Sequence, residues 1–357
     1  MNNIKNTLLL FAAGLSFNFA SAQKVDLDPF RFNFEYRNLP MEPQNKKYTT
    51  YSVYVDAPGT VTQSISRSAI EGMVNLQGFK KIYEEAHIEV RVKFNDLIID
   101  NTETKSRTDE RKDKDGKVTS SKTYYWVDVK YSFWGSYEMK DYKGTPLVAS
   151  QNMQNTPQYK YSTTEYNSSS EASNYFNNNH TAIVGKLVRE RMNDGFASLN
   201  AHINKMYGFP VTKDNMQLWL IDNKKHPEHD GMKAKWEELK PMLESVTANE
   251  MTNMKEGKIK DMITYFDGLK TTYNKDEKGD KKVRYAAFYN NAVLYLLLDQ
   301  PEKAIKEAEG LIANDYDKSD GKTLTAKAED LQVLLTKNEV KSRHFDIDLS
   351  DAKGPKN

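Results

Sequence analysis

The sequence of 357 residues contains no cysteine. The chain therefore forms no disulfide bond, offers no thiolate as a nucleophile or metal ligand, and carries no lipid attached through a cysteine. It also lacks an excess of charge of one sign, because 51 Lys and Arg residues balance 50 Asp and Glu residues. Without a basic excess, the composition argues against binding to nucleic acid or to an anionic membrane surface.

Long hydrophobic runs are missing beyond the N-terminal segment, so the sequence predicts no membrane span in the mature chain. Residues 1–22 combine Lys5 with the apolar run TLLLFAAGLSF and with the small residues ASA before Gln23. This pattern predicts a signal peptide cleaved near Ala22–Gln23, and an N-terminal membrane anchor is the alternative. We therefore expect a periplasmic or secreted protein without a lipid anchor.

The residues after the signal peptide alternate between apolar and polar side chains, which is typical of half-buried strands. The alternation is clearest in FRFNFEYR (30–37), HIEVRVKF (87–94) and TYYWVDVKYSFWGSY (123–137). The segment KDYKG (140–144), followed by TPLVAS, indicates a hairpin turn. These segments predict a sheet whose strands are mainly antiparallel.

Other segments of this half have weaker patterns. Residues 68–86 indicate a short helix or an irregular crossover, since Gly residues interrupt the apolar spacing. Residues 103–122 are charged and almost without apolar side chains, which predicts a long, mobile hairpin loop or insertion. We expect a sheet-rich α+β domain over residues 23–160, followed by a polar connector over residues 161–179.

From residue 180 the apolar spacing changes from two residues to about 3.6, which predicts helices. One apolar stripe runs from Val184 to Met206 and ends before Pro210. Further helices are expected at about 233–250, 255–271, 284–298, 301–313 and 322–336. The predicted fold class is α+β, with the sheet domain followed by an all-helical domain over residues 180–337 and a loosely attached tail over residues 338–357.

The stretch from Ala286 to Asn314 predicts two helices joined by a short turn, and four of its residues follow a known spacing. Ala292 and Ala304 are small, whereas Phe288 and Tyr295 are aromatic. With these positions the pair resembles a tetratricopeptide repeat, a helix-turn-helix unit of about 34 residues. The resemblance extends over residues 233–336. The departures are Asp299 in the turn where the family has Gly, Ala308 for a large aromatic residue, Leu311 for a small residue, and Tyr316 for the terminal Pro.

The resemblance to tetratricopeptide repeats implies a protein partner held in a concave groove. Tyr289, Val293 and Leu296 occupy the matching groove-side positions. These side chains are largely apolar, so burial under a neighbouring helix is the alternative that we favour.

His226 and His229 are the best metal-binding candidates, because they have the short spacing of zinc motifs and stand beside Glu228 and Asp230. Pro227 keeps them off one regular helical face, and no third His is nearby in the sequence. A solvated loop before a helix is the alternative. The sequence also has no G-x-S-x-G motif and no phosphate-binding glycine loop after a strand. We therefore expect neither an enzyme nor a cofactor.

Trp126 and Trp134 are a second kind of candidate, because they lie on the strand face opposite Val127 and Tyr131. Exposed aromatic rings of this kind stack on sugars or anchor a partner. The alternative is that both faces of the sheet are covered. The sequence thus favours an exported, non-enzymatic adaptor or scaffold of the bacterial cell envelope that binds a protein partner. A glycan-binding module using the two Trp residues, and a metal-dependent hydrolase at His226 and His229, are the other hypotheses.

Overall fold

The computed structural model describes residues 25–154, 156–250 and 256–355, which form two compact units. The predicted signal peptide lies outside these residues. The helical unit consists of residues 25–34, 214–246 and 256–332. The sheet unit consists of residues 35–213 without residue 155, together with residues 247–250 and 333–355. The predicted α+β class is confirmed, with sheets that are rich in antiparallel pairs preceding most of the helices.

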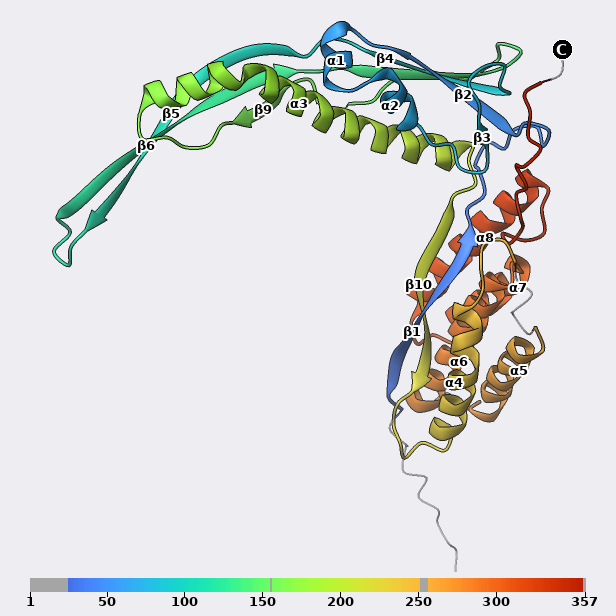
Figure 1. Cartoon of the computed structure of the whole chain (residues 1–357). Coiled ribbons are helices and arrows are strands. Elements are labelled where there is room, and N and C mark those ends of the chain that lie inside the picture. Colours follow the sequence, from blue (N-terminus) through green and yellow to red (C-terminus); the bar gives the residue numbers. More distant parts are fainter. Residues whose placement is uncertain (1–24, 155, 251–255, 356–357) are drawn as a thin grey trace, which may run out of the picture. The chain divides into compact units, whose positions relative to one another are not determined.

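The elements are labelled in Figure 1. The strands are β1 (Leu27–Arg37), β2 (Thr50–Asp56), β3 (Lys80–Lys81), β4 (Ile88–Phe94), β5 (Ile98–Lys112), β6 (Val118–Ser132), β7 (Gly135–Asp141), β8 (Pro146–Asn152), β9 (Tyr159–Ser162) and β10 (Val211–Ile221). The helices are α1 (Gly59–Ser64), α2 (Arg67–Gly72), α3 (Ser169–Met206), α4 (His229–Glu244), α5 (Glu256–Thr272), α6 (Lys278–Leu297), α7 (Pro301–Ala313) and α8 (Lys318–Asn338).

The larger sheet of the sheet unit has the strand order β3-β2-β4-β7-β8. Strands β2 and β4 are parallel, whereas the β4–β7 and β7–β8 pairs are antiparallel. A parallel pair needs a crossover connection, which here contains the short helices α1 and α2. The alternation predicted in β4 is confirmed, because Ile88, Val90 and Val92 are fully buried and Arg91 and Lys93 are exposed.

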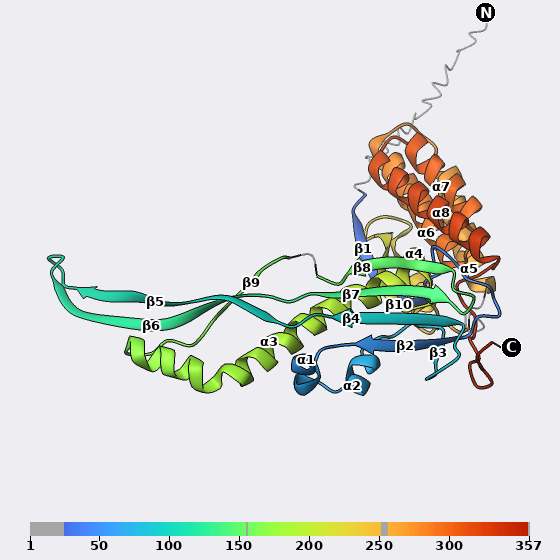
Figure 2. The ribbon, with the colours of Figure 1, turned by 90° about the horizontal axis from the view of Figure 1, so that it is seen from above.

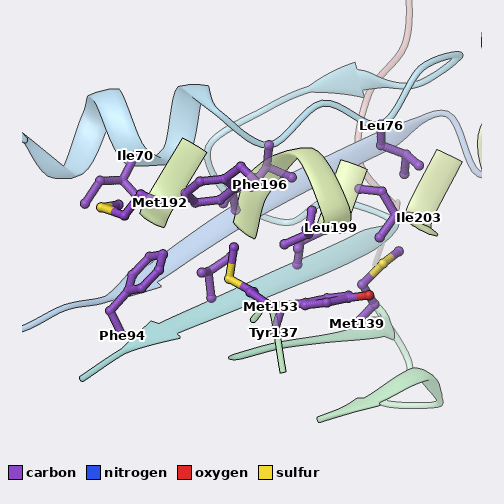
Figure 3. Packing of buried hydrophobic residues seen from close by; sticks show 14 of the residues in the cluster. Ile70, Leu76, Phe94, Tyr137, Met139, Met153, Met192, Phe196, Leu199 and Ile203 are labelled. Carbon is purple, nitrogen blue, oxygen red and sulfur yellow. The ribbon is translucent and has the colours of Figure 1, made fainter. Parts of the chain in front are cut away.

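Helix α3 packs its apolar stripe against this sheet. Figure 3 shows Met192, Phe196, Leu199 and Ile203 of the helix facing Tyr137 and other buried side chains of the sheet unit. The helix begins at Ser169, so the second half of the predicted connector is helical. The reason is that Ala172 and Phe176, both buried, extend the same stripe toward the N-terminus between polar residues.

The smaller sheet has the order β5-β6-β9 and contains a long β-hairpin (Figure 2). The prediction of a hairpin loop or insertion over residues 103–122 needs correction, because most of this segment is paired strand: β5 pairs from Ile98 to Lys112 with β6 from Val118 to Ser132. These strands lack the apolar alternation by which strands are recognised in the sequence. Backbone pairing and polar cross-strand contacts, such as Thr108 Oγ1 to Thr123 Oγ1 at 2.9 Å, stabilise them instead.

The helical unit is not purely helical, because β10 forms a two-stranded ribbon with β1. The sequence analysis did not predict β10, whose first half is polar and exposed. Helix α6 is buried almost all round, as its composition predicted, and Ala286, Ala287, Ala292 and Leu294 have no exposed surface. Helix α7 follows it after a short turn and packs against it.

The C-terminal tail makes specific contacts within the sheet unit, contrary to the expectation of loose attachment. The backbone N–H of Phe345 donates to the carbonyl of Ala248 at 3.0 Å, and Arg37 N–H donates to the carbonyl of Arg343 at 3.1 Å. Further along the tail, the ammonium group of Lys80 donates to the carbonyl of Ser350 at 3.1 Å. These hydrogen bonds place the tail in a structural role.

Helix α8 ends with Glu339 in the left-handed region, at φ 52°. The N–H of Val340 donates to Leu335 and the N–H of Glu339 donates to Thr336, both at 3.1 Å, which is a Schellman motif. We expect Glu339→Gly to be more stable than Glu339→Ala by about 1 kcal/mol, because Gly has no Cβ to disfavour this backbone conformation. Both variants lose the exposed ion pair with Lys46, so their difference in urea denaturation isolates the backbone effect. Equal stabilities would contradict this explanation.

Candidate functional site

The sheet unit contains a pocket of about 670 Å³. Its walls come from four parts of the sequence that are far apart: the loop 43–49, the pair Gly78 and Phe79, the single residue Phe209, and the C-terminal segment 337–349. Its volume lies within the range of about 300–1,000 Å³ that is usual for ligand sites.

Aromatic rings form the apolar wall of this pocket. The rings of Phe79 and Phe209 stack with their centroids 6.3 Å apart, and Phe345 meets Phe209 edge-on at 5.9 Å. Gly78 permits this arrangement, because a Cβ atom there would lie 2.8 Å from Cδ2 of Phe209. Its φ of +88° also favours Gly. Any side chain at position 78 would therefore displace the aromatic wall.

Arg37 holds two parts of the pocket wall together. Its guanidinium donates to the carbonyl of Phe209 at 3.1 Å, to the carbonyl of Phe345 at 3.4 Å and to the side chain of Asn249. It also lies 5.5 Å from the centre of the Phe345 ring. Arg37 is 7% exposed, although it lies on the polar face of a segment that the sequence predicted to be a half-buried strand.

Polar groups surround the apolar wall. Lys46 and Glu339 form an exposed ion pair at 2.8 Å, and Asp346 and Asp348 add two exposed carboxylates. The pocket therefore combines an apolar wall with charges of both signs. That composition suits a ligand that carries apolar side chains on a polar backbone.

Tyr48, which lines the pocket, also belongs to a polar cluster. Its hydroxyl donates to Asp141 at 3.2 Å, its ring stacks on His87 at 5.3 Å, and Tyr142 meets both rings edge-on. Burial works to raise the pKa of Asp141, but hydrogen bonds from backbone N–H groups and from Tyr48 outweigh it and hold the pKa below its usual value. Burial, together with Asp141, raises the pKa of Tyr48. His87 is buried, and its Nδ1 lies 2.8 Å from the hydroxyl of Thr50.

The stability of the sheet unit is expected to fall as the pH drops below about 6.5. Burial lowers the pKa of His87, so the unfolded chain takes up a proton before the folded chain does. The free energy of unfolding therefore rises with pH between the pKa of His87 in the folded chain and its higher pKa in the unfolded chain. The rise is at most about 1.4 kcal/mol per pH unit for this proton, and it is complete above the pKa of the unfolded chain. Urea denaturation at several pH values between about 5 and about 8 gives the free energy of unfolding as a function of pH. The increase of this free energy with pH should be smaller for His87→Gln than for the wild type. An unchanged slope would show that His87 does not contribute.

The two metal-binding candidates lie in the helical unit, and no residue of the described part of the chain joins them as a third ligand. His226 and His229 are 4% and 6% exposed. Nδ1 of His226 accepts the Glu228 N–H at 3.2 Å, and Nδ1 of His229 lies 2.6 Å from Asp230. Over residues 25–154, 156–250 and 256–355, no three His, Cys, Asp or Glu residues are grouped so that they could hold a metal ion.

The carboxylate of Glu228 connects this loop to helix α5. It accepts the hydroxyl of Tyr265 at 2.8 Å and the hydroxyl of Tyr273 at 3.2 Å. Burial, followed by the interaction with Glu228, raises the pKa of Tyr273 to about 12. These contacts give the segment a structural role that the sequence did not indicate.

The three groove-side residues also lie in the helical unit. Val293 and Leu296 are 3% and 7% exposed, so both are core residues. Tyr289 is half-buried, with its ring 6.3 Å from that of Trp219 on strand β10. The side of α6 that would face a groove in a tetratricopeptide repeat is thus partly covered by β10, the strand that the sequence analysis did not predict.

Trp126 and Trp134 are half-buried. The indole N–H of Trp126 donates to the carboxylate of Asp128 at 2.8 Å, which fixes the ring on the outer face of the smaller sheet. Helix α3 covers the opposite face through Val127 and Val129. Asp128 is also bound by Lys160 at 2.7 Å. The two Trp residues therefore do not form a freely exposed aromatic platform.

The sequence analysis did not identify the residues of the pocket. One signal was present in the tail, where Phe345, Ile347 and Leu349 alternate with Asp346 and Asp348. Such alternation is typical of a segment with one buried face, and it contradicts a loosely attached tail. The other walls carry no local signal.

Comparisons with known proteins do not identify a family. No protein-family model matches the chain, and no curated protein is significantly similar to it. Among solved structures, the chain is similar to a minor lipoprotein from Acinetobacter baumannii, with 10% identity over 47% of this chain and 98% of that chain. The TM-score of 0.19 is too low for this likeness to carry an argument. In the part of the chain that the structure describes, no helix has both the length and the apolar character that crossing a bilayer requires.

Proposed function

We propose that this protein is an exported, non-enzymatic adaptor or scaffold of the bacterial cell envelope, and that it binds a segment of a partner protein in the pocket of the sheet unit. The observation that carries the proposal is the aromatic wall formed by Phe79, Phe209 and Phe345, bordered by charges of both signs. Export rests on the signal-peptide pattern of residues 1–22.

A peptide segment fits the chemistry of this pocket better than a small polar metabolite does. Ring faces bind bulky apolar side chains, and Lys46, Asp346 and Asp348 offer partners for a peptide's charged groups. The tetratricopeptide-like helices remain part of the proposal as a rigid support. Their groove-side residues Val293 and Leu296 are buried, so they do not supply the binding surface.

Leu349→Arg is expected to weaken partner binding by roughly tenfold or more, because it places a charge at the apolar wall. Affinity capture from detergent-solubilised envelopes, followed by titration of the captured partner, measures the effect. Val333→Arg is the matched control, since Val333 is 54% exposed and does not line the pocket. If no partner is captured reproducibly, or if both variants bind it like the wild type, the pocket is not the binding site.

Export is tested separately from binding. N-terminal sequencing of the protein recovered from cells should begin at Gln23, the first residue after the expected cleavage site. A mature chain that still carries residues 1–22 would support the membrane-anchor alternative instead.

A glycan-binding role is the second candidate, because Tyr124 and Trp126 lie on the face of the smaller sheet that α3 does not cover. Tryptophan fluorescence upon addition of peptidoglycan fragments distinguishes the two functions. A shift that Trp126→Phe abolishes would favour the glycan, and no shift would remove this candidate.

A further inference from the structure

Strand β5 has an open edge. In the smaller sheet, β5 and β9 are the two outer strands, and in the described part of the chain the strand partner of β5 is β6 alone. Figure 2 shows β5 and β6 running side by side to the turn at the end of the hairpin. The backbone groups on the free side of an edge strand are a template for another strand. The strand is 15 residues long, so this edge is longer than that of a usual strand.

Charged residues alternate along one face of this strand. Thr104 lies opposite Val127, whose side chain packs against α3, so the even positions face the helix. The odd positions therefore face outward, and the register from Asn101 to Arg111 is regular. The outward residues are, in order, Glu103, Lys105, Arg107, Asp109 and Arg111.

This order of charges complements itself when the strand is reversed. In an antiparallel pair of two β5 strands with Arg107 opposite Arg107, Glu103 lies opposite Arg111 and Lys105 lies opposite Asp109. Each of these pairs occurs twice because the arrangement has two-fold symmetry. Cross-strand pairs of opposite charge stabilise a sheet, and like charges directly opposite one another destabilise it.

The two central Arg107 side chains do not oppose this pairing, because each carries its own counter-ions. The guanidinium of Arg107 makes two hydrogen bonds to Glu165, at 2.8 and 3.0 Å, and one to Asp109 at 2.9 Å. A shift by two residues in one direction places Glu103 opposite Asp109 and Lys105 opposite Arg107, and a shift in the other direction places Lys105 opposite Arg111. Both shifts create pairs of like charge, whereas the register centred on Arg107 has none beyond the Arg107 pair itself, so the pattern favours that alignment.

We propose that the protein forms a homodimer through antiparallel pairing of β5 with β5 of a second copy, centred on Arg107. The two three-stranded sheets then join into one continuous sheet. The alternating charges favour this register and disfavour pairing with strands of other composition. This interface uses neither the pocket nor the tail, so it does not depend on the proposed partner site.

Cysteine cross-linking tests the register. Because the native sequence contains no cysteine, an introduced cysteine is the only thiol that can form a disulfide. Residues directly opposite in an antiparallel pair have Cα atoms about 4.5–5.5 Å apart, which a disulfide spans. Under mild oxidation the mature chain with Arg107→Cys should form a covalent dimer. Lys105→Cys and Asp109→Cys should not, because their equivalents in the two copies are displaced along the strand by four residues. Equal cross-linking of all three variants, or of none, would overturn the proposal.

A charge exchange provides an independent test. In sedimentation velocity over a concentration series, Lys105→Glu or Asp109→Lys alone should raise the dimer dissociation constant on the order of tenfold, since each change creates two like-charge pairs. The double variant Lys105→Glu/Asp109→Lys exchanges the charges and should recover most of the dimerisation that each single variant loses, since Glu165 remains as the counter-ion of Arg107. Unchanged thermal melts of the single variants show that the monomer is intact. A wild type that stays monomeric, or dimers that are insensitive to these changes, would overturn the proposal. The free edge of β5 would then be available for a strand of another protein.

Discussion

Replacing Asn290 with Ala is expected to lower the free energy of unfolding of the helical unit by roughly 2–4 kcal/mol. Asn290 has no exposed surface. Its side chain accepts the backbone N–H of Trp219 at 2.7 Å and donates to the carbonyl of the same residue at 2.8 Å. One side chain on α6 thus satisfies both backbone groups of one residue on β10. Removing it leaves a donor and an acceptor without their partner in a place from which water is largely excluded.

Urea denaturation of Asn290→Ala measures this loss. Asn215→Ala is the matched control, because Asn215 is exposed and its amide makes one long hydrogen bond, 3.4 Å, to Asn33. The control should change stability by no more than about 0.5 kcal/mol. Two equal and small effects would mean that the contact between α6 and β10 contributes little.

Replacing Arg37 with Met is expected to destabilise the sheet unit by roughly 2–4 kcal/mol and to weaken partner binding. Methionine keeps the apolar stem but removes the guanidinium, so the carbonyls of Phe209 and Phe345 lose a charged donor. Arg37 is 7% exposed, so its cation is poorly solvated, and this burial lowers its pKa. The hydrogen bonds to the two carbonyls compensate for this desolvation. Removing the guanidinium leaves both carbonyls without this donor.

Hydrogen exchange distinguishes this local effect from general unfolding. The N–H of Phe345 donates to the carbonyl of Ala248. Relative to the wild type, the Arg37→Met change should increase the exchange rate of this N–H more than that of N–H groups in the centre of β4. Arg37→Lys should have an intermediate effect, since it keeps the charge but not the planar set of donors. Uniform acceleration throughout the sheet unit would mean that Arg37 stabilises the fold as a whole and not the pocket wall in particular.

Much of the secondary structure could be predicted because it depends on short-range spacing. The alternation in residues 87–94 identified β4 and its buried face, and the apolar stripe from Val184 identified most of α3. The first turns of α3 were missed because Asn and Ser residues surround Ala172 and Phe176. The outer part of the β5–β6 hairpin was predicted as a loop or insertion because it is stabilised by pairing and polar contacts, which leave no apolar pattern.

The candidate sites were less predictable than the elements. The metal hypothesis relied on the spacing of His226 and His229, but spacing along the chain does not supply a third ligand. The apolar composition of α6 predicted its burial, which the structure confirms for Val293 and Leu296. The position of Tyr289, in contrast, depends on Trp219 of β10. The sequence analysis did not predict β10, which the structure reveals through its pairing with β1.

The sequence by itself determined the absence of disulfide and thiol chemistry, the α+β class, and the buried side of strongly periodic elements such as β4 and most of α3, because composition and local periodicity control these properties. Only the tertiary structure decided the pocket, since its walls are residues 43–49, 78–79, 209 and 337–349. It also decided the roles of Arg37 and Asn290, polar residues whose partners are backbone groups far away in the chain. Backbone carbonyls and N–H groups are the same at every position, so no pattern of side chains could indicate which of them these residues would bind.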